Sequence, residues 1–587
     1  MLDLLIRGGT VVDGTGAPAR TADVGVRDGR IVEVGSVSES AKETVDANGA
    51  WVTPGFVDIH THYDGQASWD EQFSPSIFHG VTTLVMGNCG VGFAPMRPGH
   101  EGDLIKLMEG VEDIPGVTLA EGIRWGWKSF PEYMRFLEAM PHSLDFLTLV
   151  PHDPIRMQVM KERALAHEAA TPDDIAAMRT LVREALEVGA AGFSTGRSDN
   201  HRTAEGKETP AAEASLAELT GIAQAFQGLK HGNVQLVSDF DLLRGPERFD
   251  VEFDIVEHLA KASGRPVSLS WLQRDPGGEQ WKAIRARAEQ ASAKGFPVFL
   301  QAGARGIGVI IGLDASFHPF MGFPGIKEIS NLPVAERAAA MRDPARRKRV
   351  LSEKSEPMAG DNTPIPPLVD ILLSRIAMIS GRMFPLGATL NYEPSVRESF
   401  AAQAQVKGVS PLEVLYDYLA EGDGTNLIYF PIFNYNEGNL DVVHQMLSHP
   451  QALFSLADAG AHVGTVCDAS FTTFMLTHWV RDRPKDRLTL ERAVEMMTSR
   501  NAKYLGLNDR GVVAVGKRAD LNVIDGKALN MGIPRLMRDL PAGGKRFVQK
   551  AQGYVGTWVN GVAVQRSSVV TEARPGKLVR VGQGGSA

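Results

Sequence analysis

Two histidines and a cysteine stand where apolar runs of the sequence end. His60 and His62 close the run Val52 to His60, and Cys89 follows the run Val81 to Gly87. Side chains two residues apart on a strand point to the same face, so both imidazoles are expected to lie together. Imidazole nitrogen and thiolate sulfur are a ligand set that zinc favours. The three residues therefore predict a divalent metal site, with zinc as the favoured ion; the alternative for Cys89 is a buried, inert thiol.

A carboxylate with similar placement occurs late in the chain. Asp458 ends the apolar run Leu453 to Asp458 and precedes the small residues that lead to His462. A carboxylate at this position can ligate a metal and also accept the proton of an attacking water. The alternative is an N-cap for a following helix. We favour the functional interpretation, because an N-cap alone does not explain a carboxylate at the end of a fully apolar strand. The other cysteine, Cys467, lacks such a setting. We expect it to be a buried apolar residue of the core or to lie behind the metal ligands.

The elements that position these residues follow one pattern. Near-continuous apolar runs of this kind are typical of parallel strands that are covered on both faces. Amphipathic helices separate them, and the clearest begins at Thr171 and Pro172 and stops at Gly189. The pattern predicts an α/β fold with a (β/α)8 TIM-like barrel, whose mouth lies at the carboxyl ends of the strands. The eight runs are Val52 to His60, Val81 to Gly87, Asp145 to Pro151, Ala190 to Thr195, Val234 to Asp239, Val267 to Leu272, Phe296 to Gln301 and Leu453 to Asp458.

The two ends of the chain carry a different pattern. Alternating residues flank Asp28-Gly29 and Asn560-Gly561, dipeptides that favour the type I′ turn of a hairpin. We expect residues 1–53 and 506–587 to form one discontinuous β-sandwich domain and residues 54–505 to form the barrel. An excursion at about 306–450 is too long for a simple crossover, so we expect it to carry its own helices over the barrel mouth. The tail 576–587 is expected to be flexible.

Composition excludes several classes of protein. The 587 residues include 61 basic and 70 acidic side chains, a net charge of −9, which argues against a nucleic-acid partner. No apolar run approaches the roughly 18 residues of a membrane span, and the N-terminus does not resemble a secretion signal. Two cysteines cannot build a disulfide framework. We therefore expect a soluble, cytoplasmic protein.

Several ordered motifs are similar to those of the amidohydrolase superfamily, and within it to the D-aminoacylase group, the N-acyl-D-amino-acid deacylases. The subgroup resemblance rests mainly on the segments around Cys89 and Ser194. The motifs are Pro-Gly-Phe-Val-Asp-Ile-His-Thr-His (54–62), Gly-Val-Thr-Thr-Leu-Val-Met-Gly-Asn-Cys-Gly (80–90), Leu-Val-Pro-His-Asp-Pro-Ile-Arg (149–156), Gly-Phe-Ser-Thr-Gly (192–196), Ala-Asp-Ala-Gly-Ala-His (457–462) and Gly-Lys-Arg-Ala-Asp (516–520).

The resemblance implies a hydrolase that cleaves a linear carbon–nitrogen bond other than a peptide bond, in a small N-acyl-amino-acid-like substrate. By matching position it implies that His60, His62, Cys89 and Asp458 are metal ligands, with Asp458 also the general base for a metal-activated water. A homo-oligomer is a habit of the superfamily. Further residues could contact the substrate or support the ligands: His152, Ser194, Ser238, Asp239 and His462.

The sequence also departs from the family pattern. The fifth and sixth strand candidates lack the usual metal-binding histidines, so we expect one ion rather than two. Ser238, Asp239 or Asp241 could substitute as oxygen ligands. Residues 464–474 contain no lysine or arginine, so the substrate rests on the resemblance alone.

Two alternatives remain open. One is a cyclic amidase of the dihydropyrimidinase type, although residues 190–197 offer no lysine to bridge two metals. The other is a barrel of the same fold that has lost catalysis and binds a ligand or partner.

Overall fold

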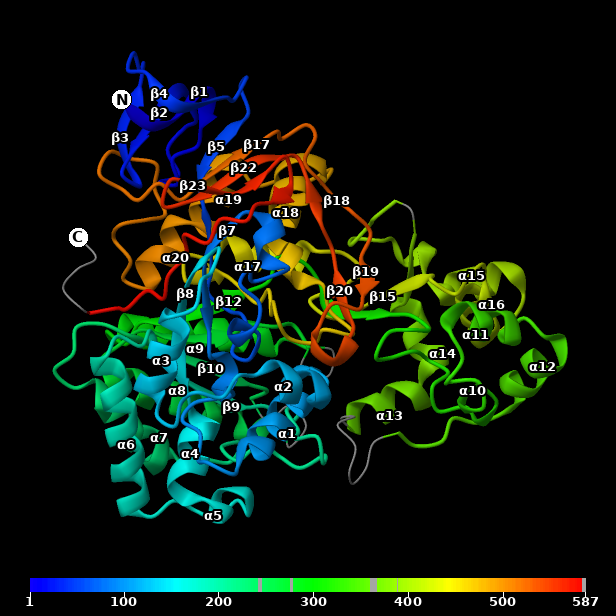
Figure 1. The fold of residues 1–587 in the computed structure, drawn as a ribbon. Coiled ribbons are helices and arrows are strands. Elements are labelled where there is room, and N and C mark those ends of the chain that lie inside the picture. The colour runs from blue at the N-terminus through cyan, green and yellow to red at the C-terminus, as the bar shows by residue number, and fades with distance from the viewer. Residues whose placement is uncertain (241–244, 275–277, 359–366, 388, 583–587) are drawn as a thin grey trace.

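The two ends of the chain meet in one sheet. The structure is a computed structural model that describes residues 1–240, 245–274, 278–358, 367–387 and 389–582. A nine-stranded sheet joins strands from both ends at the top of Figure 1, where blue and orange-red ribbons lie side by side. Its strands are β1 (Leu2–Val11), β2 (Arg20–Arg27), β3 (Arg30–Gly35), β4 (Ala41–Asp46), β5 (Trp51–Pro54), β17 (Leu521–Ile524), β22 (Tyr554–Val559), β23 (Val562–Arg566) and β24 (Val569–Val570).

Both predicted hairpins occur in this sheet. Asp28 and Gly29 have φ of 51° and 73° between β2 and β3, and Asn560 and Gly561 have φ of 51° and 76° between β22 and β23. These left-handed values explain the residue types at the two turns. The sheet confirms a β-sandwich-like domain made from both ends, while the proposed boundaries at 53/54 and 505/506 stay predictions.

The second large sheet forms the barrel. Eight strands pair in the order β16-β12-β11-β10-β9-β8-β7-β6, and their ladders are parallel. All eight predicted runs contribute a strand, which confirms the TIM-like barrel. The strands are β6 (Phe56–Asp58), β7 (Val81–Met86), β8 (Asp145–Pro151), β9 (Gly192–Arg197), β10 (Asn233–Ser238), β11 (Val267–Ser270), β12 (Val298–Ala302) and β16 (Ala452–Phe454).

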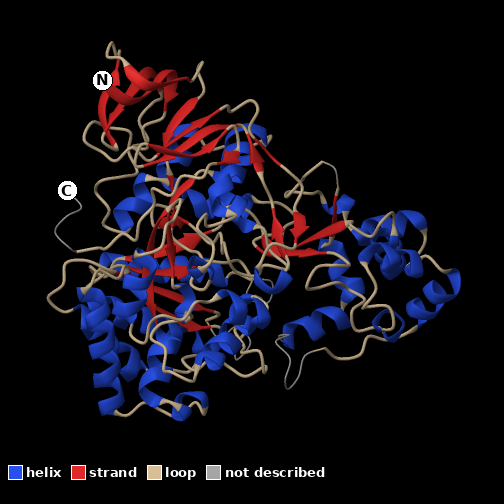
Figure 2. Cartoon of the chain, in the orientation of Figure 1, coloured by secondary structure: helices blue, strands red, loops and turns tan. Residues whose placement is uncertain are grey.

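Helices surround the barrel strands (Figure 2). The helix predicted from Thr171 is α6, and Thr171 and Asp174 form a capping box at its start. The helices are α1 (Glu101–Glu112), α2 (Gly116–Gly122), α3 (Phe130–Glu138), α4 (His152–Met160), α5 (Glu162–Leu165), α6 (Pro172–Glu187), α7 (Leu216–Ala223), α8 (Phe249–Ser263), α9 (Gln280–Ala293), α17 (Asp441–Ser448), α18 (Phe471–Phe474), α19 (Leu490–Met497) and α20 (Ser499–Tyr504). None of the helices in the described part of the chain combines the length and apolar character that a membrane crossing needs.

The first predicted strand, Val52 to His60, is split between the two sheets. β5 ends at Pro54 and pairs with β17, whereas β6 begins at Phe56 and pairs with β7. Gly55 stands at the junction, where a Cβ atom would lie 2.1 Å from the Oγ1 of Thr82. Only glycine allows this close passage, so one apolar run in the sequence serves two domains.

The barrel closes where its first and last strands meet. A parallel bridge joins Thr61 to Ala459, and the His62 amide donates to the Ala459 carbonyl at 2.8 Å. Within the two strands that precede this bridge, the carbonyls of Val57 and Phe454 both accept from the Asn501 side-chain amide at 2.8 Å. One buried side chain thus replaces the missing ladder between β6 and β16.

The end of the chain lies against the barrel, contrary to the expectation of a flexible tail. The Phe146 amide donates to Lys577, and the Val579 amide donates back to Phe146. Leu578 and Val581 are buried, and Val581 joins an apolar cluster with residues of the barrel strands. The backbone pairing and this burial hold residues 576–582 in place, so the expectation is wrong for that segment. Residues 583–587 lie outside the described part.

The excursion at 306–450 forms a lobe with its own apolar core, seen in green and yellow at the right of Figure 1. It carries helices, as predicted. Its base contacts two loops at the carboxyl ends of the barrel strands: Asn434 accepts from the Gln273 amide at 2.7 Å, and the Ser316 amide donates to Gly464 at 3.1 Å. A position over the mouth stays a prediction. The elements are β13 (Ile307–Ile311), α10 (Pro324–Lys327), α11 (Val334–Met341), α12 (Pro344–Ser352), α13 (Pro367–Ser374), α14 (Ile376–Ile379), β14 (Phe384–Leu386), α15 (Phe400–Lys407), α16 (Pro411–Ala420) and β15 (Leu427–Phe433).

The closure of the barrel can be tested at Asn501, the residue that bridges the seam between β6 and β16. We expect Asn501→Ala to lower the free energy of unfolding by about 1–3 kcal/mol, because two buried carbonyls lose their donor. Chemical denaturation followed by tryptophan fluorescence measures the change. Asn508→Ala, at an exposed asparagine seven residues on, is the control. Equal stability of the two variants would show that the seam holds without this side chain.

Candidate metal centre

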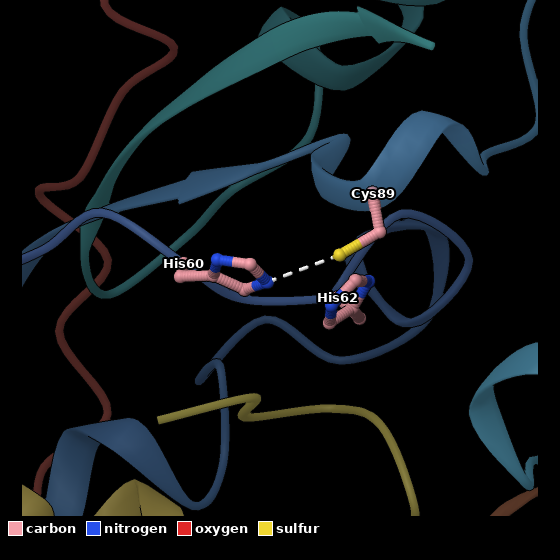
Figure 3. A group of neighbouring side chains, drawn as sticks. All are labelled: His60, His62 and Cys89. Atoms are coloured by element: carbon pink, nitrogen blue, oxygen red, sulfur yellow. Dashed lines mark hydrogen bonds between the residues drawn. The ribbon is translucent and has the colours of Figure 1, made fainter. Parts of the chain in front are cut away.

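Three of the predicted ligands meet at the carboxyl ends of β6 and β7. The ligand atoms of His60, His62 and Cys89 all lie within 4.8 Å of one another, and all three residues are buried. Figure 3 shows the sulfur of Cys89 directed at both rings, with His60 Nε2 at 3.3 Å. β6 ends at Asp58, so the histidines lie just beyond the strand. The segment nevertheless continues through the Thr61 bridge and keeps the ring centroids 5.3 Å apart.

The turn that carries Cys89 is built for close packing. Cys89 has a φ of 58°, in the left-handed region that non-glycine residues rarely adopt. Its amide donates to the side-chain oxygen of Gln235 at 2.7 Å, and the Gly90 amide donates to the Ser194 hydroxyl at 3.1 Å. The Ser194 hydroxyl in turn donates to the Gly87 carbonyl. Strands β9 and β10 therefore hold the turn that carries the thiol, through Ser194 and Gln235.

His60 is oriented by a chain of neutral groups. Its Nδ1 lies 2.6 Å from the side-chain oxygen of Gln301 on β12. The Gln301 amide donates to the Ser268 hydroxyl at 2.9 Å, which also accepts from the Tyr504 hydroxyl at 2.8 Å. Because the amide nitrogen of Gln301 is engaged with Ser268, its oxygen faces the ring and accepts a proton from Nδ1. This tautomer leaves the lone pair of Nε2 free for a metal ion.

Asp458 completes the arrangement from the loop after β16, the last strand of the barrel. Its Oδ1 lies 3.2 Å from His60 Nε2 and 3.7 Å from His62 Nε2. Its side chain is 21% exposed, whereas those of both histidines are at most 2% exposed. The loop around it has left-handed φ values at Leu456, Asp458 and His462, of 62°, 44° and 48°. Such strain clusters at functional sites, where the surrounding structure maintains it.

The charges of these residues reinforce one another. Burial opposes a charged ring, but the Cys89 sulfur and the Asp458 carboxylate outweigh it and raise the pKa of His60 to about 9. Burial also acts against ionisation of Asp458, yet His60 and His62 hold the pKa of this carboxyl well below its usual value. Without an ion, the anionic sulfur and oxygen therefore favour a protonated ring. A divalent cation that displaces this proton would meet a donor set of nitrogen, sulfur and oxygen.

The remaining predicted residues have different positions. His152 is fully buried, with Nδ1 2.9 Å from the Thr195 hydroxyl and Nε2 3.1 Å from Glu218. Both ring nitrogens are engaged away from the cluster, so a contact between His152 and substrate is not supported. The Ser194 hydroxyl contacts the turn that carries Cys89, as described above. The Nε2 of His462 lies 3.6 Å from the Oε2 of Glu112.

The predicted substitute oxygen ligands do not join the cluster. Ser238 donates to Glu252 at 3.3 Å. The Asp239 carboxylate accepts from the Ser198 hydroxyl at 2.8 Å and lies 3.5 Å from the Arg274 guanidinium. Both side chains are committed to other partners, and within the described residues the metal-type group contains only His60, His62 and Cys89. Asp241 lies outside the described residues.

Sequence reasoning missed the residues that support the ligands. Gln301 and Gln235 belong to predicted strands, where a polar side chain within an apolar run was the available signal. Glu112 ends a helix in the long loop after β7, and its place on the buried face of that helix was the available signal. Its Oε1 lies 3.1 Å from His62 Nδ1.

Comparison with known proteins agrees with this barrel and cluster. Residues 43–360 and 387–565 match the Amidohydrolase family. The chain belongs to this family, and it is a hydrolase that acts on carbon–nitrogen bonds other than peptide bonds. The chain is 27% identical to the D-aminoacylase of Alcaligenes xylosoxydans xylosoxydans, over 98% of this chain and 97% of that protein.

Two further likenesses point to the same group. The N-acyl-D-glutamate deacylase of Alcaligenes xylosoxydans xylosoxydans is 26% identical over 99% of this chain and 96% of that protein. A crystal structure of D-aminoacylase, at 26% identity, matches 99% of this chain and all of that one with a TM-score of 0.64. D-aminoacylase has a binuclear metal centre with one-metal activation and second-metal attenuation.

The two cysteines allow a direct test of the cluster. Both are 6% exposed, but His60 and His62 outweigh burial and lower the pKa of the Cys89 thiol, whereas burial raises that of Cys467. Since the thiolate is the reactive form, we expect iodoacetamide to modify Cys89 faster than Cys467 in chelator-treated protein. Zinc should protect Cys89 alone. Peptide mass spectrometry measures both rates; faster labelling of Cys467 would contradict the assignment.

Proposed function

We propose that the protein hydrolyses the amide bond of N-acyl-D-amino acids. The observation that carries the proposal is the cluster of His60, His62 and Cys89 with Asp458 against both rings. The full-length likeness to D-aminoacylase and N-acyl-D-glutamate deacylase supports the substrate class.

The donor set fits one zinc ion. Two imidazole nitrogens, one sulfur and a neighbouring carboxylate oxygen are the types and number of ligands that zinc takes. At the ends of the fifth and sixth strands, Asp239 is engaged elsewhere, and the Trp271 indole is a hydrogen-bond donor without a lone pair for a metal. A second ion would lack ligands from these strands. When bound, the ion would lower the pKa of a coordinated water to about 7 and polarise the amide carbonyl.

Asp458 is the proton carrier in this proposal. It is the most exposed member of the cluster, and its carboxylate oxygens can accept the proton of the attacking water and return it to the leaving amine. His60 and His62 stay buried and hold the geometry, and the cysteine turn fixes the sulfur opposite them.

Different observations distinguish each of the two alternatives from the proposed hydrolase. A cyclic amidase that bridges two metals needs a lysine on the fourth strand, and β9 reads Gly-Phe-Ser-Thr-Gly-Arg. No observation favours this alternative. A barrel that only binds ligands differs from a hydrolase in its activity on the substrates proposed, which the next two experiments measure.

Replacement of the proposed base should strongly slow turnover. We expect Asp458→Asn to lower kcat by about 10²–10⁴-fold on an N-acetyl-D-amino acid, the usual contribution of a general base. A ninhydrin assay of released amino acid, across D and L substrates, measures the rate. Asp423→Asn, at an exposed carboxylate of the lobe, is the control. Undiminished turnover in Asp458→Asn would refute the proposed role.

Metal removal tests the ion and its number. Dialysis against a chelator should eliminate hydrolysis, and one equivalent of zinc per chain should restore it, because one ligand set is complete. Elemental analysis gives the stoichiometry. Cys89→Ala should weaken zinc retention while Cys467→Ala should not. Full activity of protein without any divalent ion would exclude this mechanism.

A further inference from the structure

A buried carboxylate lies between two histidines at the edge of the cluster. Glu112 is the last residue of α1, and its side chain is 2% exposed. Its Oε1 lies 3.1 Å from His62 Nδ1, and its Oε2 lies 3.6 Å from His462 Nε2. Within the described part of the chain, these two histidines are the ion-pair partners of Glu112 that lie within 4.0 Å.

This position is unfavourable for the stability of α1. The C-terminus of a helix is the negative end of its dipole, where a carboxylate is destabilising. Burial adds a desolvation cost, and the next residue is another acid, Asp113. Glu112 has no arginine or lysine within ion-pair distance among the described residues, and the charged partners within 4.0 Å are the two histidines.

His62 in turn depends on Glu112. Its Nδ1 is buried, and no described group forms a hydrogen bond of full geometry with it; Glu112 Oε1 is in the same condition. The 3.1 Å approach makes each atom the other's polar partner. A carboxylate there stabilises the proton on Nδ1 and leaves the Nε2 lone pair for a metal. The neutral side-chain amide of Gln301 fixes the proton on Nδ1 of His60 in the same way.

The end of α1 also holds the loop that carries Asp458. The His462 amide donates to the main-chain carbonyl of Glu112, and the Thr465 hydroxyl donates to Asp113 at 3.2 Å. The same two residues at the helix end therefore contact a metal ligand on one side and the loop after β16 on the other.

We propose that Glu112 is a positioning residue of the metal centre, whose carboxylate fixes the tautomer and direction of the His62 ring. The inference rests on the proposed function, since it assumes that His62 binds the ion. It adds to the strand residues that support the ligands a further support from the helix after β7.

The test measures metal affinity and not only turnover. Competition with a chromophoric chelator gives the zinc dissociation constant, and the visible spectrum of the cobalt form reports ligand geometry. Loss of such a supporting carboxylate typically costs 10–100-fold in affinity, so we expect that range for Glu112→Ala together with a changed cobalt spectrum. Glu112→Gln, which keeps an oxygen near Nδ1, should recover part of the loss.

A matched variant separates this role from a structural one. Glu109→Gln, on the same helix, removes the charge of a carboxylate that accepts from the Gly116 amide at 2.9 Å, and should leave zinc affinity within twofold. Wild-type zinc affinity in folded Glu112→Ala, or an equal loss in Glu109→Gln, overturns the inference. A wild type that binds zinc but hydrolyses none of the proposed substrates defeats the proposed function while leaving this inference intact.

Discussion

The whole site depends on the closure of the barrel between its first and last strands. His60 and His62 follow β6, and Asp458 follows β16, nearly 400 residues later in the chain. The Thr61 bridge and the Asn501 side chain join these two strand ends, because no regular ladder does. The 3.2 Å approach of Asp458 to His60 is a result of that closure. If the seam shifted by one residue, the carboxylate and the rings would face different sides.

Around this junction, the two histidines are supported by unlike partners. A neutral amide from β12 orients His60, and a charged carboxylate from α1 faces His62. One support comes from a barrel strand and the other from a helix in the loop after β7, so neither strand nor helix alone defines the cluster. Gln235 and Ser194 add a third support from behind the thiol. Four elements, β9, β10, β12 and α1, thus converge on three ligands, which leaves the cluster little freedom to rearrange when an ion binds.

The sequence predicts much of this because strands and their ends carry local signals. Apolar runs mark all eight barrel strands, and the polar residues that close them mark His60, His62, Cys89 and Asp458. What it does not predict depends on contacts between distant segments. The register at Gly55 and the packing of the tail come from pairing that has no local signature. Glu112 lies on the buried face of its helix, but only the fold identifies His62 as its partner. His152 shows the converse: it follows a strand, yet its ring points into the helix layer.

The pairing of residues 576–582 with the barrel has a consequence for how the protein reaches its native state. Phe146 is held by Lys577 and Val579, more than 400 residues away in the chain, and β5 pairs with β17 over a similar separation. Contacts of this kind form late and slowly, because a long loop must close before they contribute. The three ligands, His60, His62 and Cys89, are synthesised early. They cannot form the complete site until their partners near the C-terminal end of the chain have been made. An internal deletion or a truncation at residue 575 would therefore affect the lifetime of partly folded chains, and their exposure to aggregation, before it affected the chemistry.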